Sequence, residues 1–371
     1  MSSPNVDIRP SVAPSYVPSL DGLRALAVAL VMAVHYHEEF GGGWVGVQLF
    51  FVLSGFLITR ILLDAKSTAT SLGGFLKAFW IRRALRIFPL FFAFMLVVEI
   101  FWQLASVPQT WPTARPWLLT YTLNFGHMFY FVPISDVYSH FWSLAVEEQF
   151  YPVWPFVIWF LSISALRVVV IFLLIATPLT RWWLVKTGIV EPYQLYFLTP
   201  TLLDSFAAGA ALVLFDLQWI RNVRGWLFGT LAVTLLSGLL VNLHQGFHFA
   251  LWSLGYPYFM QRAFQYAWGY TLLNLSAAIL ILACVRGASG IFANSMLVRL
   301  GKVSYGIYVI HRPLYKLITL AQPWLVEHFA LMIARIISGG VFIFGSVLLA
   351  FLSYRFLETP FLKLKSNFRY Q

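Results

Sequence analysis

Arg24 and His35 lie in one apolar segment, at a spacing of about three turns of an α-helix. Their side chains would therefore share one helix face, with a rise of about 16 Å between them. The guanidinium group could hold a phosphate, and the imidazole could take a proton from a hydroxyl group that attacks a thioester. The alternative interpretation is that Arg24 extends to the lipid headgroups and His35 forms a hydrogen bond between helices.

A basic and aromatic stretch contains Arg82, Arg83 and Arg86. Arg83 and Arg86 are three positions apart, so they would point the same way from a helix. Because guanidinium groups match the geometry of phosphates, the three arginines are candidates for binding a phosphorylated donor. The alternative is a basic cluster at the inner membrane surface that binds anionic lipid.

A third candidate site contains Trp142, Ser143 and Glu147. Ser143 and Glu147 would share a face at the outer end of a helix, and Trp142 would lie in the aromatic belt of the membrane interface. A carboxylate at this position could orient a histidine or hold a sugar hydroxyl group. Alternatively, the segment is an ordinary helix start, with Ser143 or His140 as its cap.

Ser304, Tyr308 and His311 are spaced so that they form a polar stripe on an otherwise apolar helix. Such a stripe usually faces the interior of a bundle, and we assign it to the acceptor side, although hydrogen bonding between helices explains it as well. Asp204 is a further acid in an apolar segment, without an assigned role. Gly55 would permit a close approach between helices.

Composition requires that these residues sit in a membrane. Of 371 residues, 60% are apolar and only 11% are charged, and the mean hydropathy is +0.77. A soluble fold of this length could not bury so much apolar surface, which excludes a soluble enzyme, a disordered chain and a disulfide scaffold. Long unbroken apolar runs indicate helices rather than a β-barrel. The single cysteine, Cys284, excludes a disulfide within the chain and a cysteine-based metal site.

We therefore expect an all-α, polytopic membrane bundle of about ten helices. The expected spans are 20–38, 44–63, 88–106, 141–163, 167–185, 196–215, 226–244, 264–285, 303–322 and 330–355. With both termini in the cytoplasm, most Lys and Arg residues fall in inner loops, as the positive-inside rule requires. Arg181 is one of the few basic residues that this arrangement assigns to an outer loop. The net charge of +11 reflects this distribution and not a nucleic-acid partner.

The domain boundaries follow from the spans. Residues 1–18 are expected to be a disordered cytoplasmic tail, 19–358 the membrane domain and 359–371 a second cytoplasmic tail. The first apolar segment lacks a small-residue cleavage site, so it is expected to remain as a span. Segment 114–132 is expected to be re-entrant or surface-bound, and Phe75–Pro89 an amphipathic helix at the inner surface before the third span.

The same residues resemble the membrane acyltransferase-3 family, the bacterial sugar O-acyltransferases. The resemblance extends over most of the chain. It is carried by the Arg24 and His35 spacing, Phe50-Phe51-Val-Leu-Ser54-Gly55, Arg83-Ala-Leu-Arg86, Trp142-Ser143-Leu-Ala-Val-Glu147 and Ser304-Tyr-Gly-Ile-Tyr308-Val-Ile-His311. It implies that Arg24 and His35 are the catalytic pair, that Arg83 and Arg86 lie on the donor side and that Ser143 and Glu147 lie near the acceptor.

The resemblance also implies a function. An acyl group, expected to be acetyl, would pass from cytoplasmic acyl-CoA to a hydroxyl group of an extracytoplasmic carbohydrate or glycolipid, in a bacterial inner membrane. Acyl-CoA would be a co-substrate, with no bound cofactor and no metal. His35 would act as the base, and Glu147 would orient either His35 or the acceptor. A transporter or flippase for a lipid-linked sugar is the alternative.

The sequence departs from the family pattern at two positions. Many members have Asp where this chain has Gln48, so this position is not expected to be an essential acid. Many members also have Arg two residues before the acid at position 204, where this chain has Leu202, so an ion pair is not expected at Asp204. Some members carry a C-terminal hydrolase-like domain, which we do not expect in these residues.

Overall fold

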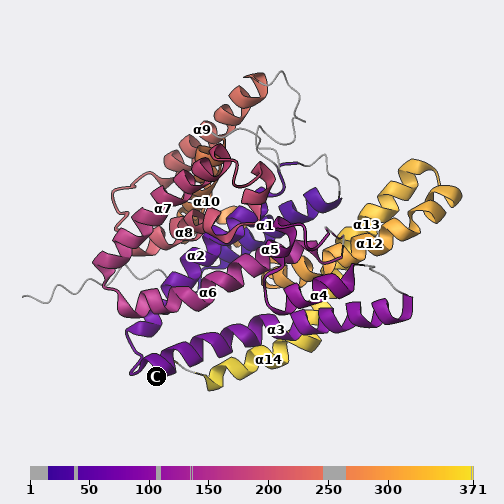
Figure 1. Ribbon diagram of the computed structural model, residues 1–371, viewed down its shortest axis with the longest axis horizontal. Coiled ribbons are helices and arrows are strands. Elements are labelled where there is room, and N and C mark those ends of the chain that lie inside the picture. The colour runs from indigo at the N-terminus through magenta and orange to yellow at the C-terminus, as the bar shows by residue number, and fades with distance from the viewer. Residues whose placement is uncertain are drawn as a thin grey trace, which may run out of the picture.

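The computed structural model describes residues 16–36, 41–105, 110–133, 135, 137–244, 265–368 and 370. Within these ranges every regular element is a helix, as the composition predicts (Figure 1). The helices surround a core that includes α1 (Pro18–Tyr36) and α2 (Val45–Lys66). Most of the expected N-terminal tail lies outside the described residues, and the helix already begins at Pro18.

The centre of the bundle is formed where α2 packs against α8 (Leu203–Leu214), with α10 (Tyr270–Val285) beside both. Gly55 lies directly against the backbone of Phe206, and a methyl group at position 55 would collide with the Phe206 carbonyl. This contact explains the glycine in α2, because only a residue without a Cβ lets the two helix backbones come so close. The predicted close approach at Gly55 is therefore confirmed.

Helix α3 (Leu72–Ala105) is one continuous helix of 34 residues. The expectation of a separate surface helix over Phe75–Pro89 is therefore wrong. Phe75, Leu76 and Phe79 are buried, so the basic half of α3 packs against the bundle instead of lying free at the membrane surface. The helix also continues through Pro89, where the surface helix was expected to end.

The segment between α3 and the next long helix does not cross the membrane as a helix. It contains α4 (Trp111–Leu119) and α5 (Leu123–Met128), of 9 and 6 residues. A membrane-spanning helix needs about 20 residues. Trp111 and Leu123 are buried in a cluster with residues of α3, so protein shields this short-helix segment as expected.

Seven helices of the described residues are long and apolar enough to span a membrane. They correspond to α1, α2, α3, α7 (Ile163–Lys186), α9 (Val223–His244), α10 and α13 (Leu331–Ser353). The expected count of ten is not confirmed. Two further expected spans coincide with α6 (Trp142–Phe160) and α12 (Ser304–His328).

The expected span over 196–215 is not a single helix. It consists of the end of η2 (Pro192–Tyr196), of η3 (Thr199–Thr201) and of α8, which has 12 residues. Pro200 interrupts this segment, because proline cannot donate the backbone hydrogen bond that a helix interior needs. The prediction of an apolar segment holds, but 3₁₀ turns precede α8, so the segment is not one continuous helix.

An ion pair joins α7 to α8. Arg181 Nη1 and Nη2 lie 2.9 and 2.8 Å from the two carboxylate oxygens of Asp204, and the side chains are 0% and 1% exposed. Arg181 also donates to the backbone carbonyls of Thr201 and Tyr266. Two expectations were therefore wrong: Arg181 does not lie in an outer loop, and Asp204 does have an ionic partner, supplied by α7.

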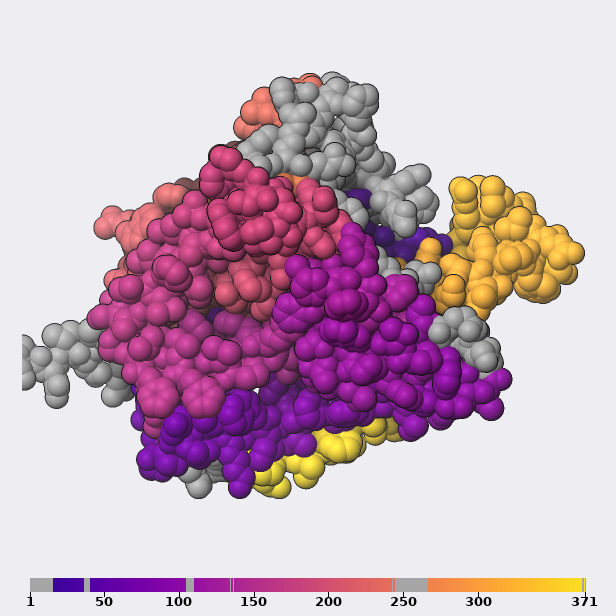
Figure 2. All heavy atoms as spheres, viewed as in Figure 1, coloured from indigo at the N-terminus to yellow at the C-terminus, as the bar shows by residue number. Residues whose placement is uncertain are grey.

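The C-terminal residues return to the bundle. Helices α12 and α13 form a pair that projects from the rest of the molecule (Figures 1 and 2). After α13 come a π-helix, η7 (Tyr354–Glu358), then α14 (Thr359–Lys363) and η8 (Leu364–Asn367). These last elements lie along α3 (Figure 1).

Candidate functional site

His35 and His311 meet at the centre of the candidate site. His35 is near the end of α1, and His311 is fully buried in the first half of α12. The Nδ1 atom of His35 lies 2.8 Å from Nε2 of His311, and the rings are stacked with their centroids 5.0 Å apart. The structure thus brings the predicted base next to a histidine that we had assigned to the acceptor side.

The hydrogen bonds of His311 determine which ring nitrogens carry protons. Its Nδ1 atom lies 2.7 Å from the carbonyl oxygen of Tyr308 and 3.2 Å from that of Ile307. Because carbonyl oxygens only accept, Nδ1 of His311 is the protonated nitrogen and its Nε2 is an acceptor when the ring is neutral. His35 must then donate from Nδ1, which leaves a lone pair on its Nε2 for proton abstraction.

The polar stripe of α12 faces the protein interior. Ser304, Tyr308 and His311 are all buried. The hydroxyl groups of Tyr308 and Ser143 are 2.6 Å apart, and the Tyr308 hydroxyl also donates to the carbonyl oxygen of His140. The stripe therefore connects α12 to the start of α6.

The position of His140 was not predicted from the sequence, where this residue was considered only in the alternative interpretation, as a helix cap. His140 lies in η1 (Ser139–Phe141) and is buried, with its ring centroid 5.1 Å from that of His311. Trp142 is also buried, against Tyr196 and Phe197, so its predicted place in the interface belt is wrong. Aromatic partners from the η2–η3 segment enclose it. No repeat or spacing in the sequence marks these two contacts.

Glu147 lies one helical turn from Ser143 on α6. Its Oε1 atom accepts from the Ser54 hydroxyl at 2.5 Å, and its Oε2 atom lies 3.5 Å from Nη2 of Arg83. Arg83 also donates from Nε to Glu148 at 3.1 Å, and its guanidinium stacks 3.4 Å above the Tyr151 ring. The structure therefore places Glu147 beside an arginine of the predicted donor side.

The three predicted donor arginines have different surroundings. Arg83 is held between α3 and α6 by the two carboxylates described above. Arg82 donates to the carbonyl oxygens of Lys365 and Phe368, each at 3.2 Å, and so holds the C-terminal segment on α3. Arg86 donates to the carbonyl oxygen of Lys302 at 3.4 Å.

Arg24 is near the start of α1, on the same helix as His35, as predicted. Its Nη1 atom lies 2.6 Å from Oδ1 of Asp21, and its side chain is 34% exposed. Arg24 contributes to the electrostatic environment of both Arg86 and Glu147. The predicted catalytic arginine is therefore close to Arg86, one of the predicted donor arginines, and lies about three turns along α1 from His35.

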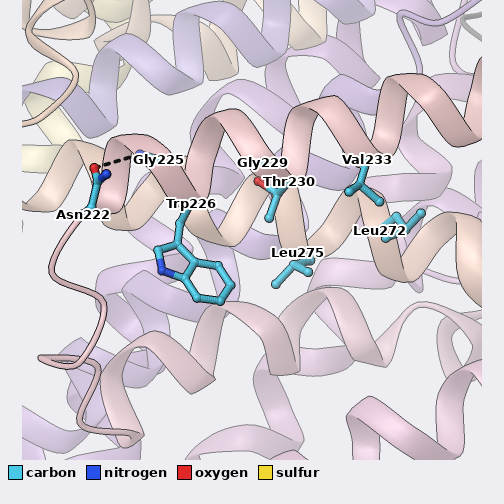
Figure 3. A pocket seen from close by; sticks show the side chains of 8 residues that line it. All are labelled: Asn222, Gly225, Trp226, Gly229, Thr230, Val233, Leu272 and Leu275. Carbon is cyan, nitrogen blue, oxygen red and sulfur yellow. Dashed lines mark hydrogen bonds between the residues drawn. The ribbon is translucent and has the colours of Figure 1, made fainter.

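One cavity lies away from these polar residues, and another lies beside Arg83. One, of about 460 Å³, lies between α9 and α10, and Asn222 and Thr230 are the polar side chains among its lining residues (Figure 3). It carries no group that could transfer a proton. The other, of about 230 Å³, is a hollow between α3 and α6 beside Arg83 and Glu148 (Figure 2). Within the described residues no group of three or more His, Cys, Asp or Glu side chains could hold a metal ion.

Comparisons with known proteins agree with the resemblance seen in the sequence. A family model described as "Acyltransferase domain" matches residues 17–355. The peptidoglycan O-acetyltransferase OatA of Listeria monocytogenes is 32% identical over 369 residues, which cover 94% of this chain and 56% of that protein. The putative peptidoglycan O-acetyltransferase YrhL of Bacillus subtilis is 31% identical, covering 93% of this chain and 55% of its own length.

A third relative, the O-acetyltransferase OatA of Staphylococcus aureus, is 28% identical over 375 residues, covering 94% of this chain and 58% of that protein. The chain thus spans slightly more than half the length of these relatives. No solved structure matches the chain significantly.

Proposed function

The chain belongs to this family of acyltransferase domains, and from that premise we propose that it transfers an acyl group from cytoplasmic acyl-CoA to a hydroxyl group of an extracytoplasmic carbohydrate. The names of its relatives support acetyl as the acyl group and a glycan of the peptidoglycan type as the acceptor. The enzyme would act as a multi-pass protein of the bacterial inner membrane, which its long apolar helices support.

The observation that carries this proposal is the contact between His35 and His311. The lone pair on Nε2 of His35 takes the proton of the acceptor hydroxyl as its oxygen attacks the thioester carbonyl carbon. The carbon–sulfur bond then breaks, and the proton passes from His35 to the leaving thiolate of coenzyme A. The products are an ester and free coenzyme A, so all atoms balance.

His311 makes His35 a better base. While His35 carries the extra proton, its Nδ1–H donates to Nε2 of His311 at 2.8 Å. A positioned acceptor of this kind stabilises an imidazolium and holds the ring in one orientation, as the third member of a catalytic triad does. Here the acceptor is a neutral imidazole, which avoids placing a second full charge in the bundle.

The polar residues along α6 join this base to the donor side. Ser143 bonds to Tyr308 at the histidine end, and Glu147 bonds to Ser54 and Arg83 one turn further along. Arg24 lies near Arg86, about three turns along α1 from His35, and is partly exposed. We assign Arg24 and Arg86 to the phosphates of the donor. For Arg83 the two carboxylates favour a positioning role.

The direct test uses purified protein in detergent with radiolabelled acetyl-CoA and a soluble peptidoglycan fragment. We expect release of free thiol and labelled ester without any membrane gradient, which a transporter would not produce. His35→Ala should abolish the transfer but still bind coenzyme A. His328→Ala is the matched control, because His328 is exposed at the far end of α12. Substantial transfer by His35→Ala would remove the assignment of His35 as base.

A further inference from the structure

Two lysines that belong to none of the motifs discussed above lie close to Arg86. Lys302 ends the short helix α11 (Ser295–Lys302), and its carbonyl oxygen accepts from Arg86. Lys365 lies in η8, where its carbonyl oxygen accepts from Arg82 at 3.2 Å and the positive charges of Arg82, Arg83 and Arg86 repel its ammonium group. Cations from α1, α3, α11 and η8 therefore lie in one region around Arg86.

The position of Lys302 is fixed by tight packing between α11 and α1. Gly301 lies directly on the backbone of Asp21, and a methyl group at position 301 would collide with the Asp21 carbonyl. Since Lys302 follows this contact immediately, its side chain is set beside the start of α1. Its Nζ atom lies 5.6 Å from the centre of the Tyr16 ring.

Tyr16 and Asp21 connect Lys302 to Arg24. The Tyr16 hydroxyl donates to Oδ2 of Asp21 at 2.8 Å, and Oδ1 of Asp21 accepts from Arg24 at 2.6 Å. Lys302 is exposed and Arg24 is 34% exposed, so an anion could reach both cations from outside the bundle.

The region carries more positive than negative charge. Its cations are Arg24, Arg86, Lys302 and Lys365. The carboxylates that interact with them are Asp21, which pairs with Arg24, Glu358, a buried residue at the end of η7 that attracts Arg86, and Glu147, which attracts Arg24 but already pairs with Arg83. If Glu147 is counted with its partner Arg83, two carboxylates remain against four cations. The region then has a net positive charge, and an anion with several negative charges would relieve the repulsion among the cations.

We propose that Lys302 and Lys365, with Arg24 and Arg86, form a binding site for the phosphate groups of the nucleotide portion of the donor. The inference rests on the proposed function and extends it, because it assigns donor binding to two residues outside the arginine motif. Arginine forks and lysine ammonium groups together suit a ligand that carries both a diphosphate and a phosphate monoester.

Anionic lipid headgroups present the same phosphate chemistry. The test separates the two sources by measuring binding of coenzyme A to protein in nanodiscs made only of phosphatidylcholine, and again in nanodiscs that contain phosphatidylglycerol. Coenzyme A carries no acyl group, so its binding is independent of acyl transfer. Failure of the proposed function would leave this binding intact.

We expect Lys302→Ala and Lys365→Ala each to weaken coenzyme A binding about ten-fold, which corresponds to about 1.4 kcal/mol. We expect one of the two lysines to contact the 3′-phosphate of coenzyme A. The alanine variant of that lysine should lose less affinity for 3′-dephospho-coenzyme A, which lacks this phosphate, than for coenzyme A. Arg299→Ala and Lys363→Ala are the matched controls, because both side chains are exposed and lie within three residues of the tested lysines. We expect these controls to bind like the unaltered protein.

Two results would overturn the proposal. One is unchanged affinity for coenzyme A in both lysine variants in phosphatidylcholine nanodiscs. The other is a difference between the variants and the unaltered protein that appears only in nanodiscs with phosphatidylglycerol, since the site would then serve lipid headgroups. The thermal unfolding midpoint of each variant is measured in parallel, and Lys302→Gln and Lys365→Gln replace any alanine variant that does not fold.

Discussion

Nδ1 of His35 lies 2.8 Å from Nε2 of His311, although the two residues are 276 positions apart in the chain. The pair joins the first helix of the bundle to α12, and the carbonyl of Tyr308 fixes the direction of the hydrogen bond between the rings. A base in this arrangement depends on a partner that need not touch the substrate. His311 is therefore a positioning residue, and the dependence can be measured.

Replacing His311 should lower kcat much more than it changes KM. His311→Ala removes the acceptor that stabilises the protonated form of His35, and we expect a loss in kcat of about a hundred-fold, within the range for general base catalysis. His311→Gln should recover part of the loss, because its amide oxygen can accept from His35. Steady-state kinetics with varied acyl-CoA gives both parameters. Equal activity of the alanine and glutamine variants would argue against this role.

Arg83 and Glu147 should be energetically coupled. Arg83→Gln leaves Glu147 and Glu148 without their shared cation, whereas the double variant Arg83→Gln, Glu147→Gln also removes one of the two carboxylates. We expect the double variant to lose less stability than the sum of the single variants, with a coupling of about 1–2 kcal/mol. Thermal unfolding midpoints in detergent test this. Additive losses would mean that the two side chains do not interact.

Much of the site could be predicted from spacing within single helices. Arg24 and His35 do lie on one helix, and the stripe of Ser304, Tyr308 and His311 does face inward. Helical periodicity carries this information, because a buried face recurs about every 3.6 residues. Gly55 could be predicted for a similar reason, since a small residue in an apolar helix marks a close contact.

Contacts between distant segments could not be predicted in this way. One sequence does not show which helices are neighbours, so the pairing of Arg181 with Asp204 was missed and Arg181 was assigned to a loop. The same limit applies to Glu147, which contacts Arg83 on another helix. Hydropathy alone also did not predict that the helix is interrupted near Pro200, because 3₁₀ turns and α-helices can be equally apolar.

The buried pair of Arg181 and Asp204 should be critical for stability. Asp204→Ala leaves a buried guanidinium uncompensated, and we expect it to cost about 3–5 kcal/mol of unfolding free energy. The double variant Arg181→Met, Asp204→Leu removes both charges and should recover much of this loss. Thermal unfolding in detergent provides the measurement, with Lys186→Ala, at an exposed position on α7, as control. If Asp204→Ala melts like the control, the ion pair does not stabilise the fold.

The contact of Gly55 with Phe206 allows a prediction with the smallest possible substitution. Gly55→Ala adds one methyl group that would collide with the carbonyl oxygen of Phe206, so α2 and α8 must separate. We expect a lower thermal unfolding midpoint, and reduced activity as well, because Ser54 is the neighbouring residue on α2 and donates to Glu147.

Gly340→Ala on α13 is the matched control for this variant, because a methyl group there meets open space. Alanine is favoured over glycine inside a helix by about 1 kcal/mol, so the control should be neutral or slightly stabilised. Gly55→Ala would gain the same helix propensity, and a net loss at position 55 must therefore come from the collision between the two helices. An unchanged midpoint in Gly55→Ala would show that α2 and α8 are not packed as closely as the structure places them.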